Sequence, residues 1–388
     1  MINTNWRAAI YVAVTAVSMV LAWQYATVRI NHRGNWIGLF DLGNRWPPPA
    51  ELSAEYAHGS TNDAGYDGVF YHMVSHDPWL ERGYSRYADN ASLRWRRILI
   101  PGLAHIVSLG RDEWVDACYI GVNLLFIFAG VFWLACYCEA NAQHPGWGLA
   151  FLAIPSVLVS IDRLTIDTAL AALTMGFILY ASRGSDGRSL AVLTLCPLAR
   201  ETGLLLTAGQ VWQRLRERKW LGLLLAIGTA LPSLLWFLFV FRNTPRDDTP
   251  WLSYPLAGIL RRTIHPLQYP ITGPWVALAA SLDYLALIGI WIALGFSLRL
   301  ALKRSSGLLQ HCIYCFAFAA LWLGKADIWA GAYEFGRTLS PLLILLGLLA
   351  VRNKDRRLLL PLAFVLPRIL LQYEPQVRGI LRVLAVAF

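Results

Sequence analysis

The stretch WLGLLLAIGTALPSLLWFLFVF, residues 220–241, decides the fold of this chain because it contains no charged residue. A helix of about 20 apolar residues crosses the hydrocarbon core of a bilayer, which is roughly 30 Å thick. Apolar runs of similar length cover residues 8–28 and 275–298. These runs predict an all-α polytopic membrane protein.

The composition favours the same class over a soluble protein. Hydrophobic residues make up 56% of the chain and charged residues 15%, whereas a soluble surface needs more charge. The net charge of +10 could indicate nucleic acid, but loop Lys and Arg in membrane proteins set topology and meet anionic headgroups. Because no nucleic-acid-binding motif is present, we expect membrane lipids and no nucleic acid as partners.

The N-terminal run and the cysteines carry no processing or redox pattern. The run lacks a small-residue cleavage site, so a membrane helix is predicted rather than a cleavable signal. The six cysteines lie in or beside apolar segments, and no disulfide framework is expected. The spacing Cys312-x-x-Cys315 inside an apolar helix favours packed thiols over metal or redox chemistry.

Short basic loops predict the orientation, because such loops stay in the cytoplasm. Four of them cover residues 183–188, 214–219, 299–304 and 352–357. With two crossings between neighbouring loops, the pattern predicts about ten or eleven transmembrane helices and a cytoplasmic N-terminus. The apolar segment 98–109 is too short to cross and is predicted to be an interfacial or re-entrant helix.

One membrane domain is predicted over residues 1–388. Residues 1–30 hold the first transmembrane helix, residues 31–112 form an extracytoplasmic loop with interfacial helices, and residues 113–388 hold the remaining transmembrane helices. The loop carries several arginines, but the positive-inside bias is weak for loops beyond about 60 residues.

The long loop contains the strongest candidate for chemistry. Asp67 lies in Gly65-Tyr66-Asp67-Gly68-Val69-Phe70-Tyr71, and Arg94, Arg96 and Arg97 follow beside the membrane. A carboxylate can activate a hydroxyl, and guanidiniums bind phosphate in a bidentate fork. The pattern favours a site for an anionic, lipid-linked substrate. The alternative for each arginine is that it reaches lipid headgroups and has no catalytic role.

Other polar groups of the loop have weaker claims. His72 and His76 are four residues apart, as metal ligands on one helical face are, but no third ligand is in register, which favours polar packing. Glu55 and Asp63 are interpreted as solvated. Asp41 is a second candidate acid.

Three further sets of charged residues fall at predicted outer helix ends. Charged groups near the membrane are costly and usually face a cavity or a partner. Together with the loop, these sets favour one polar site at the outer membrane surface, although ion pairs at helix caps are an equal alternative for each set. The sets are Asp162-Arg163 with Asp167, Arg200-Glu201, and Glu334 with Arg337. Asp283, inside an apolar run, is predicted to be an interhelical hydrogen-bond partner.

In these segments the chain resembles the GT-C superfamily of polytopic membrane glycosyltransferases, and more narrowly bacterial members distantly similar to GPI-type mannosyltransferases. The resembling segments are Tyr66-Asp67-Gly68-Val69-Phe70-Tyr71, His76-Asp77-Pro78, Arg96-Arg97-Ile98-Leu99-Ile100-Pro101, residues 160–167, Leu198-Ala199-Arg200-Glu201-Thr202-Gly203 and Tyr333-Glu334-Phe335-Gly336-Arg337. Their order covers most of the chain. A clear pair of adjacent loop acids, common in the superfamily, is missing here, so the dependence on a divalent metal stays open.

The resemblance implies a GT-C-like fold whose long first outside loop carries the catalytic acid, here Asp67. It implies a polyprenyl-phosphate-sugar donor and an active site that faces away from the cytoplasm of a bacterial inner (plasma) membrane. It also places Arg163 and Asp167 at an outer turn, and Arg200 at a basic position. No cofactor is otherwise expected.

The resulting hypothesis is an inverting transfer of a sugar to a hydroxyl of a glycan, lipid or protein acceptor in cell-envelope synthesis. Asp67 would accept the hydroxyl proton, and Arg96, Arg97 or Arg200 would stabilise the departing phosphate. The predicted substrate-binding residues are Tyr71, Arg94, Arg96, Arg97, Arg163, Asp167, Arg200, Glu201, Glu334 and Arg337. A transporter or flippase of lipid-linked sugars, which would show internal repeats, and a non-catalytic envelope-assembly subunit remain alternatives.

Overall fold

The computed structural model describes residues 6–59, 65–245, 251–265, 267, 269 and 273–387. Asp63, interpreted above as solvated, lies outside these residues. Within them the chain is helical, and the only β pairing is an isolated bridge between Leu252 and Leu323. The six cysteines carry no disulfide. The predicted all-α architecture is confirmed for the described part of the chain.

Four helical segments are long and apolar enough to cross a membrane. They are α1 (Trp6–Asn31), α6 (Asp112–Ala140), α14 (Pro274–Leu302) and the consecutive helices α11 (Trp220–Gly228) and α12 (Leu231–Asn243).

Three bent helix pairs raise the number of candidate spans to as many as seven. They are η4 (Pro145–Ala153) with α7 (Pro155–Arg163), bent by 64°; α16 (Ala332–Thr338) with α17 (Ser340–Asn353), bent by 60°; and η7 (Arg356–Leu359) and α18 (Leu360–Leu371) with α19 (Glu374–Ala387), bent by 49°. The chain is therefore a multi-pass membrane protein. The expected ten or eleven crossings also require shorter helices and stay a prediction.

The shorter helices complete the bundle. Those between the long segments are α8 (Asp167–Ser182), α9 (Asp186–Ala199), η5 (Glu201–Gly203), α10 (Leu204–Arg216), α13 (Ala257–Ile264), α15 (Leu308–Trp322) and η6 (Ala326–Trp329). Those of the first long loop are η1 (Trp36–Phe40), η2 (Ala50–Leu52), α2 (Ser53–Gly59), α3 (Gly68–His76), η3 (Tyr84–Tyr87), α4 (Ala91–Arg96) and α5 (Leu99–Val107).

Small side chains allow the first helix to pack closely. Ala9, Ala13 and Ala16 of α1 are fully buried and repeat at helical spacing along the face that meets α6 and η4. Without a bulky side chain between them, helix backbones in a bilayer approach closely and gain van der Waals contact. This packing places the C-terminal end of α1 beside the loop elements.

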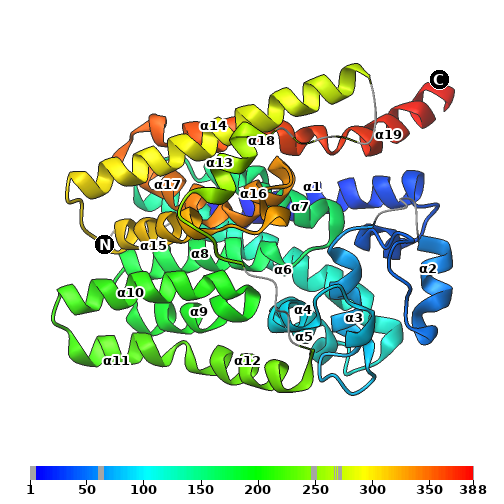
Figure 1. Cartoon of the computed structure of the whole chain (residues 1–388), viewed down its shortest axis with the longest axis horizontal. Helices are drawn as coiled ribbons and strands as arrows, with labels where there is room; N and C mark the ends of the chain where they lie inside the picture. The colour runs from blue at the N-terminus through cyan, green and yellow to red at the C-terminus, as the bar shows by residue number, and fades with distance from the viewer. Residues whose placement is uncertain are drawn as a thin grey trace.

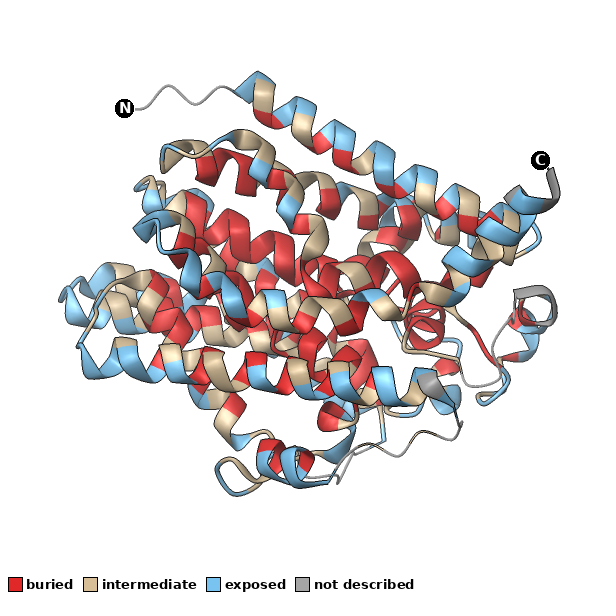
Figure 2. Ribbon diagram, turned by 90° about the horizontal axis from the view of Figure 1, so that it is seen from above, coloured by how far each residue is buried: buried red, intermediate tan, exposed pale blue. Residues whose placement is uncertain are grey.

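The outer surface of the bundle is apolar. Leu221, Leu224, Leu231 and Leu235 on α11 and α12 are more than half exposed, while buried residues concentrate on the helices inside the bundle (Figure 2). Exposed apolar surface of this extent is unfavourable in water and is the surface that lipid chains cover.

The loop helices α2 to α5 gather at one end of the molecule, and the C-terminal helix α19 reaches the same end (Figure 1). Asn31, at the end of α1, donates from Nδ2 to the carbonyl oxygen of Gln376 at 3.2 Å. Segments from both halves of the sequence therefore meet there.

The predicted orientation can be tested with single cysteines. Glu81 lies in the first loop and Lys303 in the turn between α14 and α15, and both are exposed. We expect a membrane-impermeant maleimide to label Glu81→Cys in intact spheroplasts and Lys303→Cys only after lysis. None of the six native cysteines is exposed, so background labelling should be low. The reverse pattern would contradict the orientation derived from the basic loops.

Candidate functional site

The position of Asp67 is fixed by the glycine that follows it. Gly68 opens helix α3, and a β-carbon there would overlap the carbonyl oxygens of Arg163 and Phe40. Only glycine allows this close approach, so α3 begins in contact with the end of α7 and with η1. Asp67 is thereby held beside the charged end of α7.

Two arginines, 243 residues apart in the sequence, hold the Asp67 carboxylate. Arg94 of α4 donates from Nη2 to Oδ1 at 2.8 Å, and Arg337 of α16 donates from Nη2 to Oδ2. Arg337 also donates from Nη1 to the Tyr66 hydroxyl at 3.1 Å. The Asp67 side chain is 18% exposed, so a ligand can reach the carboxylate.

The Tyr71 hydroxyl links the arginines that hold Asp67 to a second ion pair, between Arg97 and Glu201. It accepts from Arg97 Nη1 at 3.0 Å and from Arg94 Nη1 at 3.5 Å. Arg97 forms a bidentate ion pair with Glu201 of η5, at 2.9 Å from Nε and 2.6 Å from Nη2. Arg94 forms a further bidentate pair with Asp89, at 2.9 and 2.7 Å.

Asp167 connects Arg337 to a fourth arginine, Arg200. Its Oδ1 accepts from Arg200 Nη1, and its Oδ2 lies 3.6 Å from Arg337 Nε. Arg200 also donates from Nη2 to Thr338 Oγ1 at 3.2 Å. The turn between α9 and α10 is thus joined to α8 and α16.

The fifth arginine, Arg163, completes the group. It donates to Asp41 Oδ2 from Nη1 and to Asp162 Oδ2 from Nε at 3.1 Å. Its guanidinium carbon lies 5.1 Å from the ring centroid of Tyr66 and 5.7 Å from that of Tyr333, within the range of cation–π attraction.

We call this group the arginine cluster. It comprises Arg94, Arg97, Arg163, Arg200 and Arg337 with the carboxylates of Asp41, Asp67, Asp89, Asp162, Asp167 and Glu201. The charged sets that the sequence placed at separate helix ends lie in one contiguous group. Six carboxylates face five guanidiniums, so the arginines of the cluster are already paired before any anion binds.

Two of the predicted binding residues stand apart from these contacts. Arg96 donates from Nε to the Ser92 carbonyl at 3.0 Å, and its guanidinium lies 6.0 Å from the ring of Phe237 on α12. Glu334 is half-buried on α16, one turn before Arg337, and forms no ion pair with another described residue. Asp89 and Tyr66, which the sequence analysis did not select, belong to the site through Arg94 and Arg337.

The ionisation of Asp67 follows from its partners. Burial raises the pKa of this carboxyl, but the Arg337 and Arg94 guanidiniums outweigh burial and hold the pKa well below its usual range. Asp67 is therefore ionised at neutral pH, with both oxygens engaged. A carboxylate held in this way is a weak base until a ligand draws the arginines away.

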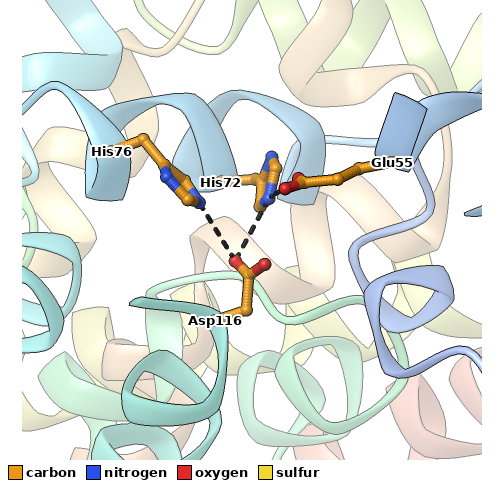
Figure 3. Close-up of side chains that lie close together, drawn as sticks. All are labelled: Glu55, His72, His76 and Asp116. Carbon is orange, nitrogen blue, oxygen red and sulfur yellow. Dashed lines mark hydrogen bonds and ion pairs between the residues drawn. The ribbon is translucent and has the colours of Figure 1, made fainter. Parts of the chain in front are cut away.

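A second polar cluster lies on a different face of α3. The buried rings of His72 and His76 point toward Asp116 of α6, and Glu55 of α2 approaches His72 (Figure 3). One interpretation from the sequence was wrong, since Glu55 is not simply solvated. The polar packing favoured for the histidine pair is present, and it involves further carboxylates. They come from other helices and so could not appear in the spacing. Burial lowers the pKa of His72, but Asp116 and Glu55 raise it to about 9.

Asp283 is an interhelical hydrogen-bond partner, as predicted. Its Oδ1 accepts from the Ala332 backbone N–H at 3.0 Å and lies 3.3 Å from Arg368 Nε. Its Oδ2 accepts from Tyr269 at 2.5 Å and from Arg262 at 3.3 Å. Asp283 thus connects α14 to α13, α16 and α18.

An apolar cavity of about 850 Å³ lies between α10, α14 and α15. Trp212, Trp291 and Phe318 line it, with Arg216 and Arg304 among the lining residues. None of its lining residues belongs to the arginine cluster, so charged chemistry and the apolar cavity occupy separate parts of the molecule.

No protein-family model, curated protein or solved structure matches this sequence.

Proposed function

We propose that this chain is a glycosyltransferase that transfers a sugar from a polyprenyl-phosphate donor to an acceptor hydroxyl on the extracytoplasmic side of the membrane, with inversion. The observation that carries the proposal is the partly exposed Asp67 carboxylate between Arg94 and Arg337, inside the arginine cluster. The resemblance of this segment to GT-C enzymes supports the same assignment.

The pairing of Asp67 suggests how the donor would prepare the base. A donor phosphate that binds Arg94 or Arg337 would compete with Asp67, because both guanidiniums are already paired with this carboxylate. Once an arginine turns to the phosphate, the Asp67 pKa rises toward its ordinary value near 3.9. The base would then become effective only when the donor is present.

The chemical step is a single displacement. The acceptor oxygen bonds to the anomeric carbon, the bond from that carbon to the phosphate oxygen breaks, and Asp67 receives the hydroxyl proton. The polyprenyl phosphate leaves with the electron pair of the broken bond. Guanidiniums of the arginine cluster, which form charge-assisted bonds with phosphate, would stabilise the charge on that leaving group.

A direct assay tests the proposal. The full chain in lipid nanodiscs would receive a panel of radiolabelled polyprenyl-phosphate hexoses and pentoses with membrane extract as acceptor. We expect one donor to be consumed with equal amounts of new glycoside and free polyprenyl phosphate. Translocation of a donor across proteoliposomes without glycoside formation would instead support a flippase. The absence of both activities would support a non-catalytic subunit.

A further inference from the structure

The cluster of Glu55, His72, His76 and Asp116 has the composition of a transition-metal site. Imidazole nitrogens and carboxylate oxygens are ligands that Zn²⁺ takes in proteins. One ligand atom from each of the four residues can be chosen so that all lie within 4.8 Å of one another. His72 and His76 are fully buried, while the side chains of Asp116 and Glu55 are 19% and 32% exposed.

Three of the six distances between the four ligand atoms are close to those of a tetrahedron around one ion, and all four atoms lie within 4.8 Å of one another. With metal–ligand bonds of about 2.0–2.1 Å, neighbouring ligand atoms of a tetrahedral site lie about 3.3–3.4 Å apart. His72 Nε2 lies 3.1 Å from Asp116 Oδ1 and 3.3 Å from Glu55 Oε2, and His76 Nε2 lies 3.4 Å from Asp116 Oδ1.

The orientation of the ligand groups is a separate observation. His72 Nε2 and Glu55 Oε2 make no directed hydrogen bond with a described residue, although both atoms are buried. Buried polar atoms without hydrogen bonds are rare. Atoms that approach one another without donor–acceptor alignment are expected when they converge on a point between them (Figure 3).

A further shell of residues supports His76 as a ligand. Its Nδ1 lies 2.9 Å from Asp112 Oδ1, and Arg82 donates to both oxygens of Asp112 at 2.8 Å. If Nδ1 carries the proton and donates to Asp112, the lone pair of Nε2 faces Asp116. A carboxylate behind a metal-bound histidine commonly fixes the ring in this way.

We propose that Glu55, His72, His76 and Asp116 bind one Zn²⁺ ion, which joins α2, α3 and α6. The site is structural, because four protein ligands leave no open position for a substrate. Its effect on the arginine cluster is indirect: α3 carries both histidines on one face and begins directly after Asp67. This inference does not depend on the proposed glycosyl transfer.

Metal content and spectroscopy of the full-length protein test the site. The protein in detergent would be treated with a chelator, desalted and titrated with Zn²⁺ or Co²⁺. We expect about one Zn²⁺ per chain by mass spectrometry of the metal, a higher melting temperature on binding, and the visible absorption bands of tetrahedral Co²⁺. Stripped, folded protein that binds no Zn²⁺ at micromolar concentration would overturn the proposal.

Variants locate the ion. The double substitution His72→Gln and His76→Gln should abolish Zn²⁺ binding and the Co²⁺ bands, while His144→Asn, at an exposed histidine away from the cluster, should keep both. Unchanged binding in the double variant excludes this site. If the double variant does not fold, Asp112→Asn is the alternative test. Loss of the Asp112 carboxylate that orients His76 should weaken Zn²⁺ affinity by about 10- to 100-fold. Unchanged Zn²⁺ affinity in Asp112→Asn would count against the site.

Discussion

Replacing Asp67 by asparagine is expected to reduce sugar transfer by about 10²- to 10⁴-fold, the contribution of a positioned general base. The affinity for the donor should stay the same or increase. The substitution would keep the shape of the side chain but remove the negative charge that competes with phosphate for Arg94 and Arg337. A fall in kcat without a rise in KM for the donor would therefore identify Asp67 as the base.

The two roles that Asp67 could have give different kinetics. If it served only to orient the arginines, Asp67→Asn would raise KM for the donor and change kcat little. Asp327→Asn is the matched control, because that carboxylate has 82% of its side chain exposed and lies outside the arginine cluster. Full activity of a folded Asp67→Asn protein would refute the proposed base.

Arg337→Gln should have the largest effect on stability. Arg337 contacts Asp67, Asp167 and the Tyr66 hydroxyl. The variant leaves the largely buried Asp67 with Arg94 alone, and the buried Asp167 with Arg200 alone, as counter-charge. Removing one partner of a buried pair costs about 3–5 kcal/mol. We therefore expect a clear loss of thermal stability in detergent, together with loss of donor binding.

A double-mutant cycle separates this pair from the rest of the cluster. Adding Asp67→Asn to Arg337→Gln removes a carboxylate that has lost one of its two arginine partners, so the double variant should be more stable than Arg337→Gln alone. Coupling energies of about 0.5–3 kcal/mol are usual for residues in one ion-pair network. Additive effects of the two substitutions would mean that the ion pair contributes nothing to stability. Arg242→Gln, at an exposed position on α12, controls for charge removal.

Apolar runs and charge patterns predicted the class of this protein, because a bilayer constrains every spanning segment in the same way. They did not predict the bends in the pairs α16–α17 and η4–α7, which depend on packing against neighbouring helices. The expectation of one polar site at the outer helix ends agrees with the grouping of Asp67, Arg200 and Arg337, whereas the partner of each arginine depends on tertiary structure.

The histidine cluster shows the limit of spacing arguments most clearly. The four-residue interval between His72 and His76 indicates a shared helical face, but it contains no information about what lies opposite. Glu55 and Asp116 come from segments 17 residues before His72 and 40 residues after His76. Only the packing of α2 and α6 against α3 brings them into reach.

The length of α3 has a consequence for the natural variation of this protein. Each inserted or deleted residue rotates the following part of a helix by about 100°, so a change between Asp67 and His76 would move Tyr71 away from Arg97 or the histidines away from Asp116. We expect related chains to differ in length before residue 65 and to keep this ten-residue interval unchanged. Gly68 should be retained with it, since a side chain there would separate α3 from α7.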